Sequence, residues 1–87
     1  MIAMTNSPVR SVIVANPHGL HIRACASIVE TVSAFNAHAT VCRGVLCAEA
    51  NSILELLMLT AHQGTELILR ATGPDADTLL DALAELF

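Results

Sequence analysis

Residues 37–49 read AHATVCRGVLCAE, and their pattern indicates two strands joined by a tight turn. In residues 37–43, Ala and Val alternate with His, Thr and Cys, which is the two-residue period of a half-buried β-strand. Gly44 follows, and glycine adopts the backbone conformations that tight turns need. Residues 45–49 then return as a second strand. The segment predicts an antiparallel hairpin, and the rest of the chain must cover one of its faces.

The residues before the hairpin predict a strand followed by a long helix. Residues 10–15 are rich in β-branched side chains, and the run ends at Asn-Pro-His-Gly in residues 16–19. Residues 21–35 have the 3.6-residue period of an amphipathic helix. Their apolar positions are Ile22, Cys25, Ile28, Val29, Val32 and Phe35.

The residues after the hairpin predict a helix, a strand and a last helix. Residues 51–61 have helical texture, and Ser52 and Glu55 have the spacing of a capping box. Residues 66–71 alternate again as a strand, and Gly73-Pro74 opens the last helix. We expect the buried stripe of that helix to consist of Ala76, Leu79, Leu80 and Leu83.

The order β-α-β-β-α-β-α predicts an α+β fold. Four half-apolar strands need one face covered, and three amphipathic helices need a surface to cover. The fold that satisfies both is a two-layer open-faced sandwich, with a four-stranded antiparallel sheet and three helices on one face. We expect a single domain over residues 1–87, in which residues 1–8 form a loosely ordered N-terminal extension. Predicted core residues are Val12, Val14, Val29, Val32, Leu67, Leu69, Leu80 and Leu83.

Charge and hydropathy exclude several classes of protein. The formal net charge is −4, there is no lysine, and the basic side chains other than histidine are four scattered arginines. Nucleic-acid and anionic-membrane binding rest on clustered Lys and Arg, so neither is expected. There is no apolar run of the roughly 18 residues that a membrane helix needs, and the N-terminus does not read as a secretion signal. We therefore expect a cytoplasmic protein.

The three cysteines predict free thiols. Their number is odd and their spacing is not that of a metal site. Cys25 belongs to the apolar stripe of the first helix, and we expect Cys42 and Cys47 to be reduced in a reducing cell.

The stretch that indicates chemistry is Asn-Pro-His-Gly-Leu-His-Ile-Arg, residues 16–23. A strand ends, a glycine allows a tight approach, and a helix begins at or just after His21. The backbone N–H groups of a first helical turn have no partner within the helix and bind phosphate oxygens readily. A neutral imidazole is a competent nucleophile, and the Arg23 guanidinium could contribute to the same site.

These residues resemble a known family. Residues 16–23 match N-x-x-G-L-H-x-R in the pattern N-x-x-G-L-H-x-R-x-A, which is similar to the active-site signature of HPr, and Cys25 stands at the position of its last alanine. HPr is the histidine-containing phosphocarrier of the bacterial phosphoenolpyruvate-dependent sugar phosphotransferase system. The resemblance continues without gaps from residue 10 to residue 87. It includes Phe35-Asn36, Asn51-Ser52-Ile53-Leu54, the segment 59–64 and Gly73-Pro74-Asp75.

The resemblance implies a phosphoryl carrier rather than a turnover enzyme. His21 would accept the group at Nδ1 from phosphorylated Enzyme I, which phosphoenolpyruvate charges, and would pass it to an EIIA domain. Arg23 would steady the phosphate, with the backbone N–H groups of Arg23 and Ala24. No cofactor or metal is implied, and we expect a monomer. The apolar docking patch for both partners would consist of Ile53, Leu54 and Leu57.

The sequence also departs from the family pattern. Ala24 replaces the usual proline and restores a backbone N–H that could reach the phosphate. Ile22 is bulkier than the usual Ala or Thr. In some family members, an HPr kinase/phosphorylase phosphorylates the serine at the position of Ser52. Here Asn51 replaces the preceding lysine, and Glu55 would repel a phosphoserine, so regulation at Ser52 is disfavoured.

Two alternatives stay open at this point. His18, His21 and Cys25 are close in sequence and could form a metal site with an open position. Alternatively, the protein could be an HPr-like regulatory or interaction module that docks partners with little or no phosphotransfer.

Overall fold

Strands and helices follow one another in the predicted order in the computed structural model, which describes residues 7–87. The first three elements are β1 (Val9–Ile13), α1 (Ile22–Ser33) and β2 (His38–Arg43). The other four are β3 (Leu46–Glu49), α2 (Ile53–Met58), β4 (Glu66–Thr72) and α3 (Ala76–Ala84).

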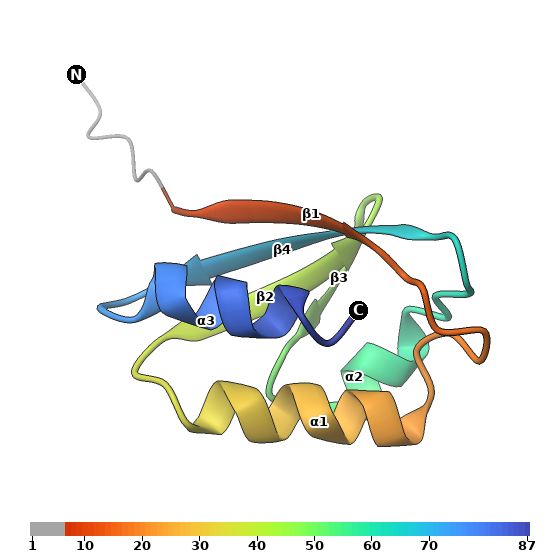
Figure 1. Cartoon of the computed structure of the whole chain (residues 1–87), viewed down its shortest axis with the longest axis horizontal. Helices are drawn as coiled ribbons and strands as arrows, with labels where there is room; N and C mark the ends of the chain where they lie inside the picture. The colour runs from red at the N-terminus through yellow and green to blue at the C-terminus, as the bar shows by residue number, and fades with distance from the viewer. Residues whose placement is uncertain (1–6) are drawn as a thin grey trace.

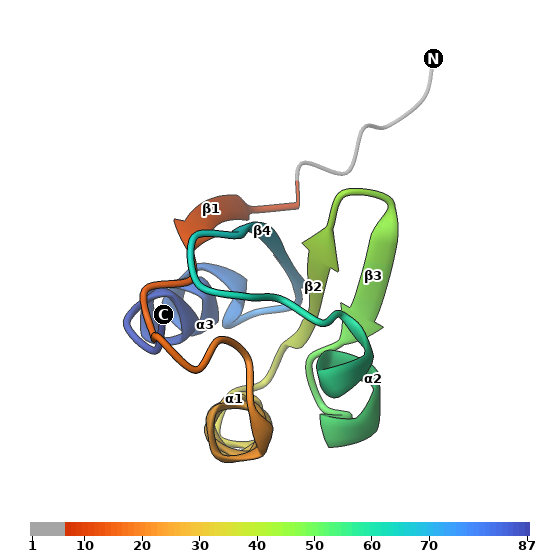
Figure 2. The same ribbon diagram turned by 90° about the vertical axis from the view of Figure 1, so that its right-hand side faces the viewer.

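The strands form one antiparallel sheet in the order β1-β4-β2-β3. All three helices lie on the same side of the sheet, and its other face is open (Figure 1, Figure 2). The predicted α+β open-faced sandwich is therefore confirmed. In Figure 2, the start of α1 and the helix α2 lie at the same end of the molecule, which is the end toward the viewer.

The core lies between the sheet and the helices. Alternate side chains of β4 point into it: Leu67, Leu69 and Ala71 are buried, while Glu66 and Arg70 are exposed. Each fully buried Leu contributes about 2–3 kcal/mol through removal of its apolar surface from water. The buried stripe predicted for α3 is confirmed at all four positions. Of the predicted core residues, Val12 and Val29 are only partly buried against this core, and the other six are buried.

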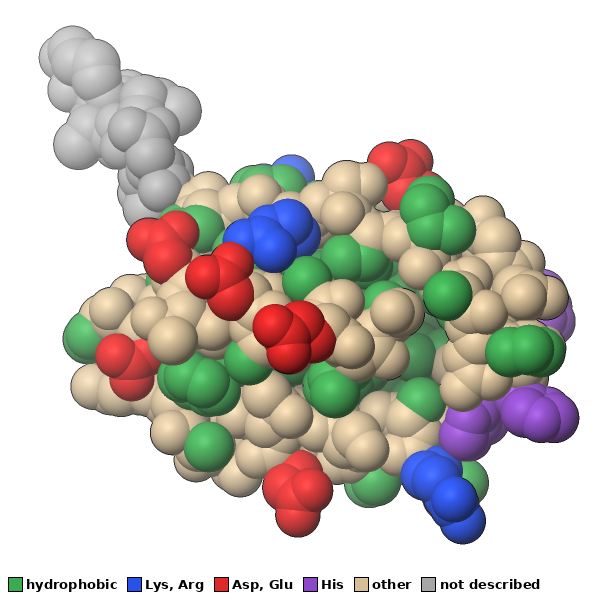
Figure 3. Space-filling view, in the orientation of Figure 1, with side chains coloured by type: hydrophobic (Ala, Val, Ile, Leu, Met, Phe, Trp, Pro, Cys, Tyr) green, Lys and Arg blue, Asp and Glu red, His purple; other side chains and the backbone are tan. Residues whose placement is uncertain are grey.

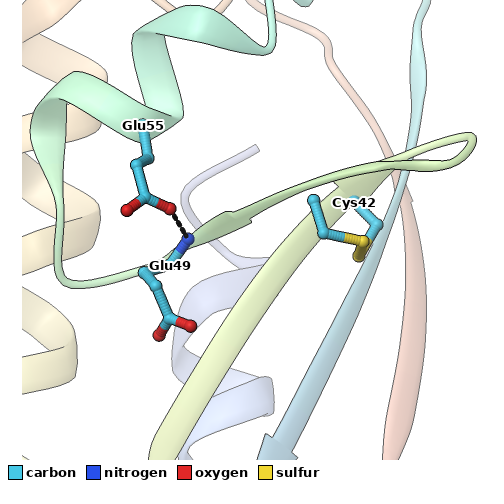
Figure 4. The surroundings of a disulfide bond; sticks show 4 residues. Cys42, Glu49 and Glu55 are labelled. Carbon is cyan, nitrogen blue, oxygen red and sulfur yellow. Dashed lines mark hydrogen bonds between the residues drawn. A yellow bond between two sulfur atoms is a disulfide. The ribbon is translucent and has the colours of Figure 1, made fainter.

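The hairpin of β2 and β3 pairs two of the three cysteines. Gly44, with φ of 60°, occupies the first position of the two-residue loop, where a positive φ suits the twist of the strands. The register places Cys42 directly opposite Cys47, with Cα atoms 4.0 Å apart, and the two form a disulfide (Figure 4). The expectation of free thiols at these positions was wrong. The alternation had already placed both side chains on one face of the hairpin, where opposite residues touch.

Two helices end earlier than predicted. Helix α1 ends at Ser33 rather than at residue 35, and α2 spans only Ile53–Met58 of the predicted 51–61. Thr60 lies just beyond α2 with φ of 52°, in the left-handed region that ends helices.

The predicted N-terminal extension, residues 1–8, lies mostly outside the described residues, which begin at residue 7. The carbonyl of Pro8 accepts a hydrogen bond from the Ala71 amide at 3.2 Å, next to the first pair of the β1–β4 ladder. Within residues 7–87, no helix has the length and apolar character needed to cross a membrane.

Candidate functional site

The loop from β1 to α1 is pinned to the segment that follows α2. The Gly19 amide donates to the Asn16 carbonyl at 2.8 Å, which closes a tight turn. The Leu20 amide then donates to the Ala61 carbonyl at 2.8 Å. Gly19 has φ of 67°, and a Cβ there would lie 2.5 Å from the Ala61 oxygen. A glycine is therefore required for the loop to deliver the next residues to the start of α1.

His21 is the N-cap residue of α1, as predicted. Its backbone is extended, with φ of −95° and ψ of 176°, and its carbonyl accepts the first helical hydrogen bond from Cys25 at 2.9 Å. Its side chain makes no capping hydrogen bond, and no acidic residue stands in the first turn. The N–H groups of that turn are thus open to an external anion.

An open hollow of about 210 Å³ lies beside the helix start. His21 is half-buried at its wall, and Arg23 is exposed at its rim. Figure 3 shows histidine side chains and a basic side chain gathered at the end of the molecule where α1 begins. Acidic side chains of this view lie elsewhere, so the end is suited to an anion. The lining residues are Asn16, His21, Arg23, Ala24, Ser27 and Leu86.

The imidazole of His21 is held by two neighbours that the sequence did not reveal. The Asn16 amide nitrogen lies 3.2 Å from His21 Nε2, and the Asn16 amide oxygen accepts from the His18 backbone N–H at 2.9 Å. The His18 ring stands edge-on to His21, with centroids 5.9 Å apart and an interplanar angle of 89°. An Asn two residues before a free backbone N–H is an Asx-turn signal. That signal could have drawn attention to Asn16.

Cys25 lies on the inner face of α1. Its side chain is fully buried, and its sulfur lies 3.9 Å from the Leu20 carbonyl oxygen. Burial raises the pKa of the Cys25 thiol. The structure therefore does not bring Cys25 to the exposed His18 and half-buried His21, and the core role predicted for it is confirmed. In the part of the chain that the structure describes, no three His, Cys, Asp or Glu side chains are placed to hold a metal ion.

The three predicted docking residues differ in exposure. Leu54 is 69% exposed, whereas Ile53 and Leu57 are half-buried against the core. On the helices α1 and α2, two further apolar side chains are nearly as exposed as Leu54: Met58, one turn later on α2, and Ile22, in the first turn of α1. Sequence reasoning had placed Ile22 in a buried stripe, and this was wrong. The buried face of α1 consists of Cys25, Ile28 and Val32, which begin one turn further along the helix.

Ser52 is the N-cap residue of α2, as the capping-box spacing predicts. Its hydroxyl oxygen accepts from the Glu55 amide at 3.2 Å. The Glu55 carboxylate does not return to the Ser52 amide, which donates to the Glu49 carbonyl at 3.1 Å. It accepts instead from the Glu49 amide at 2.9 Å (Figure 4). The box is therefore half-formed, and the carboxylate ties α2 to the end of β3.

Comparison with known proteins identifies the family of the chain. A family model described as the PTS HPr component phosphorylation site matches residues 9–87. The chain belongs to the HPr family. It is 41% identical over 75 residues to the phosphocarrier protein HPr of Xylella fastidiosa (strain 9a5c), a match that covers 86% of this chain and 84% of the relative. HPr-family proteins are phosphocarriers of the phosphotransferase system, and the resemblance found in the sequence is thus confirmed.

Two further similarities agree with this assignment. The crystal structure of HPr from Bacillus anthracis str. Ames has a TM-score of 0.89 at 26% identity, and the match covers 94% of this chain and 98% of that chain. The phosphoryl donor subunit DhaM of a PEP-dependent dihydroxyacetone kinase from Klebsiella michiganensis is 34% identical over 76 residues. That match covers 87% of this chain but only 16% of DhaM. An HPr-like segment therefore also occurs inside a longer phosphoryl donor.

Proposed function

We propose that this HPr-family chain accepts a phosphoryl group on His21 from phosphorylated Enzyme I and transfers it to an EIIA domain in sugar uptake. The observation that supports this most directly is the placement of His21. It is the N-cap of a helix whose first-turn N–H groups have no side-chain cap, and it lines an open hollow with Arg23. This combination offers a nucleophile and an anion site within one turn of backbone.

In the proposed transfer, the ring of His21 is the nucleophile, and the start of α1 binds the phosphoryl oxygens. The lone pair of Nδ1 attacks phosphorus, the bond from phosphorus to Enzyme I breaks, and its electron pair stays with Enzyme I. The ring then releases one proton to solvent. The N–H groups of Arg23 and Ala24 and the Arg23 guanidinium stabilise the phosphoryl oxygens, because such transfers depend chiefly on positioning and charge. The N–H of Ala24, absent from a proline, adds one donor.

The same end of the molecule offers a surface for both partners. Leu54 is exposed on α2, beside half-buried Ile53 and Leu57, and Met58 continues the apolar strip by one helical turn. We propose that Enzyme I and EIIA dock here in turn and that the carrier works as a cytoplasmic monomer. An HPr kinase/phosphorylase is a weaker proposal. The Ser52 hydroxyl already caps α2, and Glu55 would repel a phosphate there.

The test is phosphotransfer from phosphoenolpyruvate with purified Enzyme I. We expect wild-type protein to gain one acid-labile phosphate and His21→Ala to gain none. His38→Ala is the matched control, because His38 is an exposed histidine on β2 and should leave labelling unchanged. Label retained by His21→Ala would contradict the site. Wild-type protein that binds Enzyme I without accepting label would support the interaction module instead.

A further inference from the structure

The side chain of Asn16 touches the nitrogen of His21 that the proposed transfer does not use. We propose that Asn16 is a positioning residue that keeps His21 Nε2 a hydrogen-bond acceptor and thereby prolongs the lifetime of the phosphohistidine. This inference rests on the proposed function of His21, but part of its test does not require phosphorylation.

The orientation of the Asn16 amide follows from its second contact. The His18 backbone N–H can only donate, so the amide atom 2.9 Å from it must be the oxygen. The amide nitrogen then faces His21 Nε2 at 3.2 Å. Asn16 is half-buried, and its backbone carbonyl accepts a hydrogen bond from the Gly19 amide at 2.8 Å. The backbone that carries the Asn16 side chain is therefore fixed as well. The loop therefore presents a donor, not an acceptor, to Nε2.

A donor at Nε2 selects one form of the neutral ring. The amide nitrogen of Asn16 can only donate, so Nε2 must supply the lone pair and the ring proton sits on Nδ1. Attack through Nδ1 requires that proton to move to Nε2, which breaks the contact with Asn16. The unphosphorylated ring is thus held in its less reactive tautomer, at the cost of one hydrogen bond when it reacts.

Once phosphate is attached, the contact between Asn16 and Nε2 slows the loss of that phosphate. With Nδ1 bonded to phosphorus, Nε2 has either a lone pair or a proton. A proton on Nε2 lets the ring leave as neutral imidazole when water attacks phosphorus. Without that proton the leaving group is the anionic imidazolide, and cleavage of the P–N bond is slow. By donating to the lone pair, Asn16 disfavours protonation and protects the bond until a partner displaces the loop or competes for Nε2.

The hydrogen bond also fixes the orientation of the His21 ring. A half-turn of the ring would exchange Nε2 for a carbon facing Asn16 and would lose the contact of 3.2 Å. The contact therefore favours the orientation in which Nδ1 is the nitrogen that Asn16 leaves free. The exposed His18 ring stands beside the pair, perpendicular to His21 with ring centroids 5.9 Å apart.

The test uses two variants that share only the loss of the donor. Asn16→Asp keeps the oxygen that accepts from His18 but cannot donate to Nε2 when ionised, and Asn16→Ala removes the amide without adding charge. After phosphorylation by Enzyme I and removal of the donor, loss of phosphate is followed by ³¹P NMR. We expect both variants to lose phosphate about fivefold faster than wild type, which is the effect of one ordinary hydrogen bond.

The second measurement is the ¹⁵N spectrum of the neutral, unphosphorylated His21 ring. In wild type we expect the Nε2 signal in the range of an unprotonated nitrogen, and in Asn16→Asp in the range of a protonated one. A role confined to folding of the loop would not move this signal. Asn36→Asp is the matched control, because Asn36 is an exposed asparagine beyond the other end of α1.

The proposal is overturned if Asn16→Asp leaves both the Nε2 signal and the phosphate lifetime at their wild-type values. It is also overturned if Asn36→Asp changes them equally, since charge alone would then account for the effect. If wild-type protein accepts no phosphate, the proposed function fails, and the ¹⁵N spectrum still decides whether Asn16 donates to Nε2. The two failures are therefore distinguishable.

Discussion

Helix α1 begins at a histidine whose side chain makes no capping hydrogen bond, whereas α2 begins at a serine whose side chain does. In α1, the third position after the cap is Ala24 and the first turn has no acidic side chain. In α2, the third position is Glu55, whose amide is capped by the Ser52 hydroxyl and whose carboxylate lies near the helix start. The start of α1 lies next to the segment that follows α2, because the Leu20 amide donates to the Ala61 carbonyl.

The difference shows how one fold separates stability from binding. A capped start satisfies its own N–H groups and stabilises the helix, but it leaves little for a ligand. An open start gives up that stabilisation and keeps donors and a positive end for an anion. Helix α1 tolerates the open start because its length and buried face, which includes Cys25, Ile28 and Val32, hold it against the sheet.

The largest expected effect comes from closing the open start. Ala24→Glu gives α1 the residue that α2 has at the same position, so a carboxylate competes for the first-turn N–H groups and repels phosphate. We expect phosphorylation of His21 by phosphoramidate, a small donor that needs no docking, to slow by at least about tenfold, or about 1.4 kcal/mol. The rate is measured by ³¹P NMR.

The matched control for this change is Ala26→Glu. Ala26 is exposed, and two residues along a helix correspond to about 200° of rotation, so its side chain leaves the opposite face. It should be phosphorylated at close to the wild-type rate. Equal rates for Ala24→Glu and Ala26→Glu would show that the start of α1 is not the anion site.

An intermediate effect is expected from opening the closed start. Ser52→Ala removes the acceptor of the Glu55 amide and should lower the free energy of unfolding by about 1 kcal/mol, measured by urea denaturation. Ser52→Asp retains a capping oxygen and should remain within a few tenths of a kcal/mol of wild type. Labelling of His21 by phosphoramidate should be unchanged in both. A Ser52→Ala protein as stable as wild type would remove the contrast between the two helices.

The smallest effect concerns the buried face that holds α1 in place. Burial raises the pKa of the Cys25 thiol above its ordinary value of 9.0, so above that pH the unfolded chain binds fewer protons than the folded one. Stability must then fall as pH rises through that range. We expect the free energy of unfolding to fall more steeply between about pH 8 and 10 for wild type than for Cys25→Ala. Parallel slopes would mean that Cys25 is not buried as a neutral thiol.

Local patterns were sufficient for the elements and for the choice of candidate site residues. The alternation of residues 37–43, the helical period of residues 21–35 and the spacing of Ser52 and Glu55 each depend on neighbours within a few positions. The helix start at His21 was predicted for the same reason, since glycine, histidine and the apolar stripe follow one another directly. Helix ends were less predictable, because the left-handed Thr60 has no sequence signal comparable to glycine.

The features that were missed depend on which residues meet across the fold. Prediction of the Cys42–Cys47 disulfide needs the exact partners in the hairpin register. The odd number of cysteines and the expected reducing compartment had predicted free thiols instead. The contact of Asn16 with His21 needs the turn between them to bring an amide nitrogen to one edge of a ring. The exposure of Met58 depends on how α2 sits against the sheet.

The amino-acid sequence by itself determined the order of strands and helices, the histidine at a helix start and the resemblance to HPr. These follow from side-chain periodicity and short motifs, which act over one or two turns of backbone. Only the tertiary structure decided that Cys42 and Cys47 are joined and that an amide donor faces Nε2. Such facts depend on distances of a few ångströms between segments whose relative placement is set by packing of the whole core.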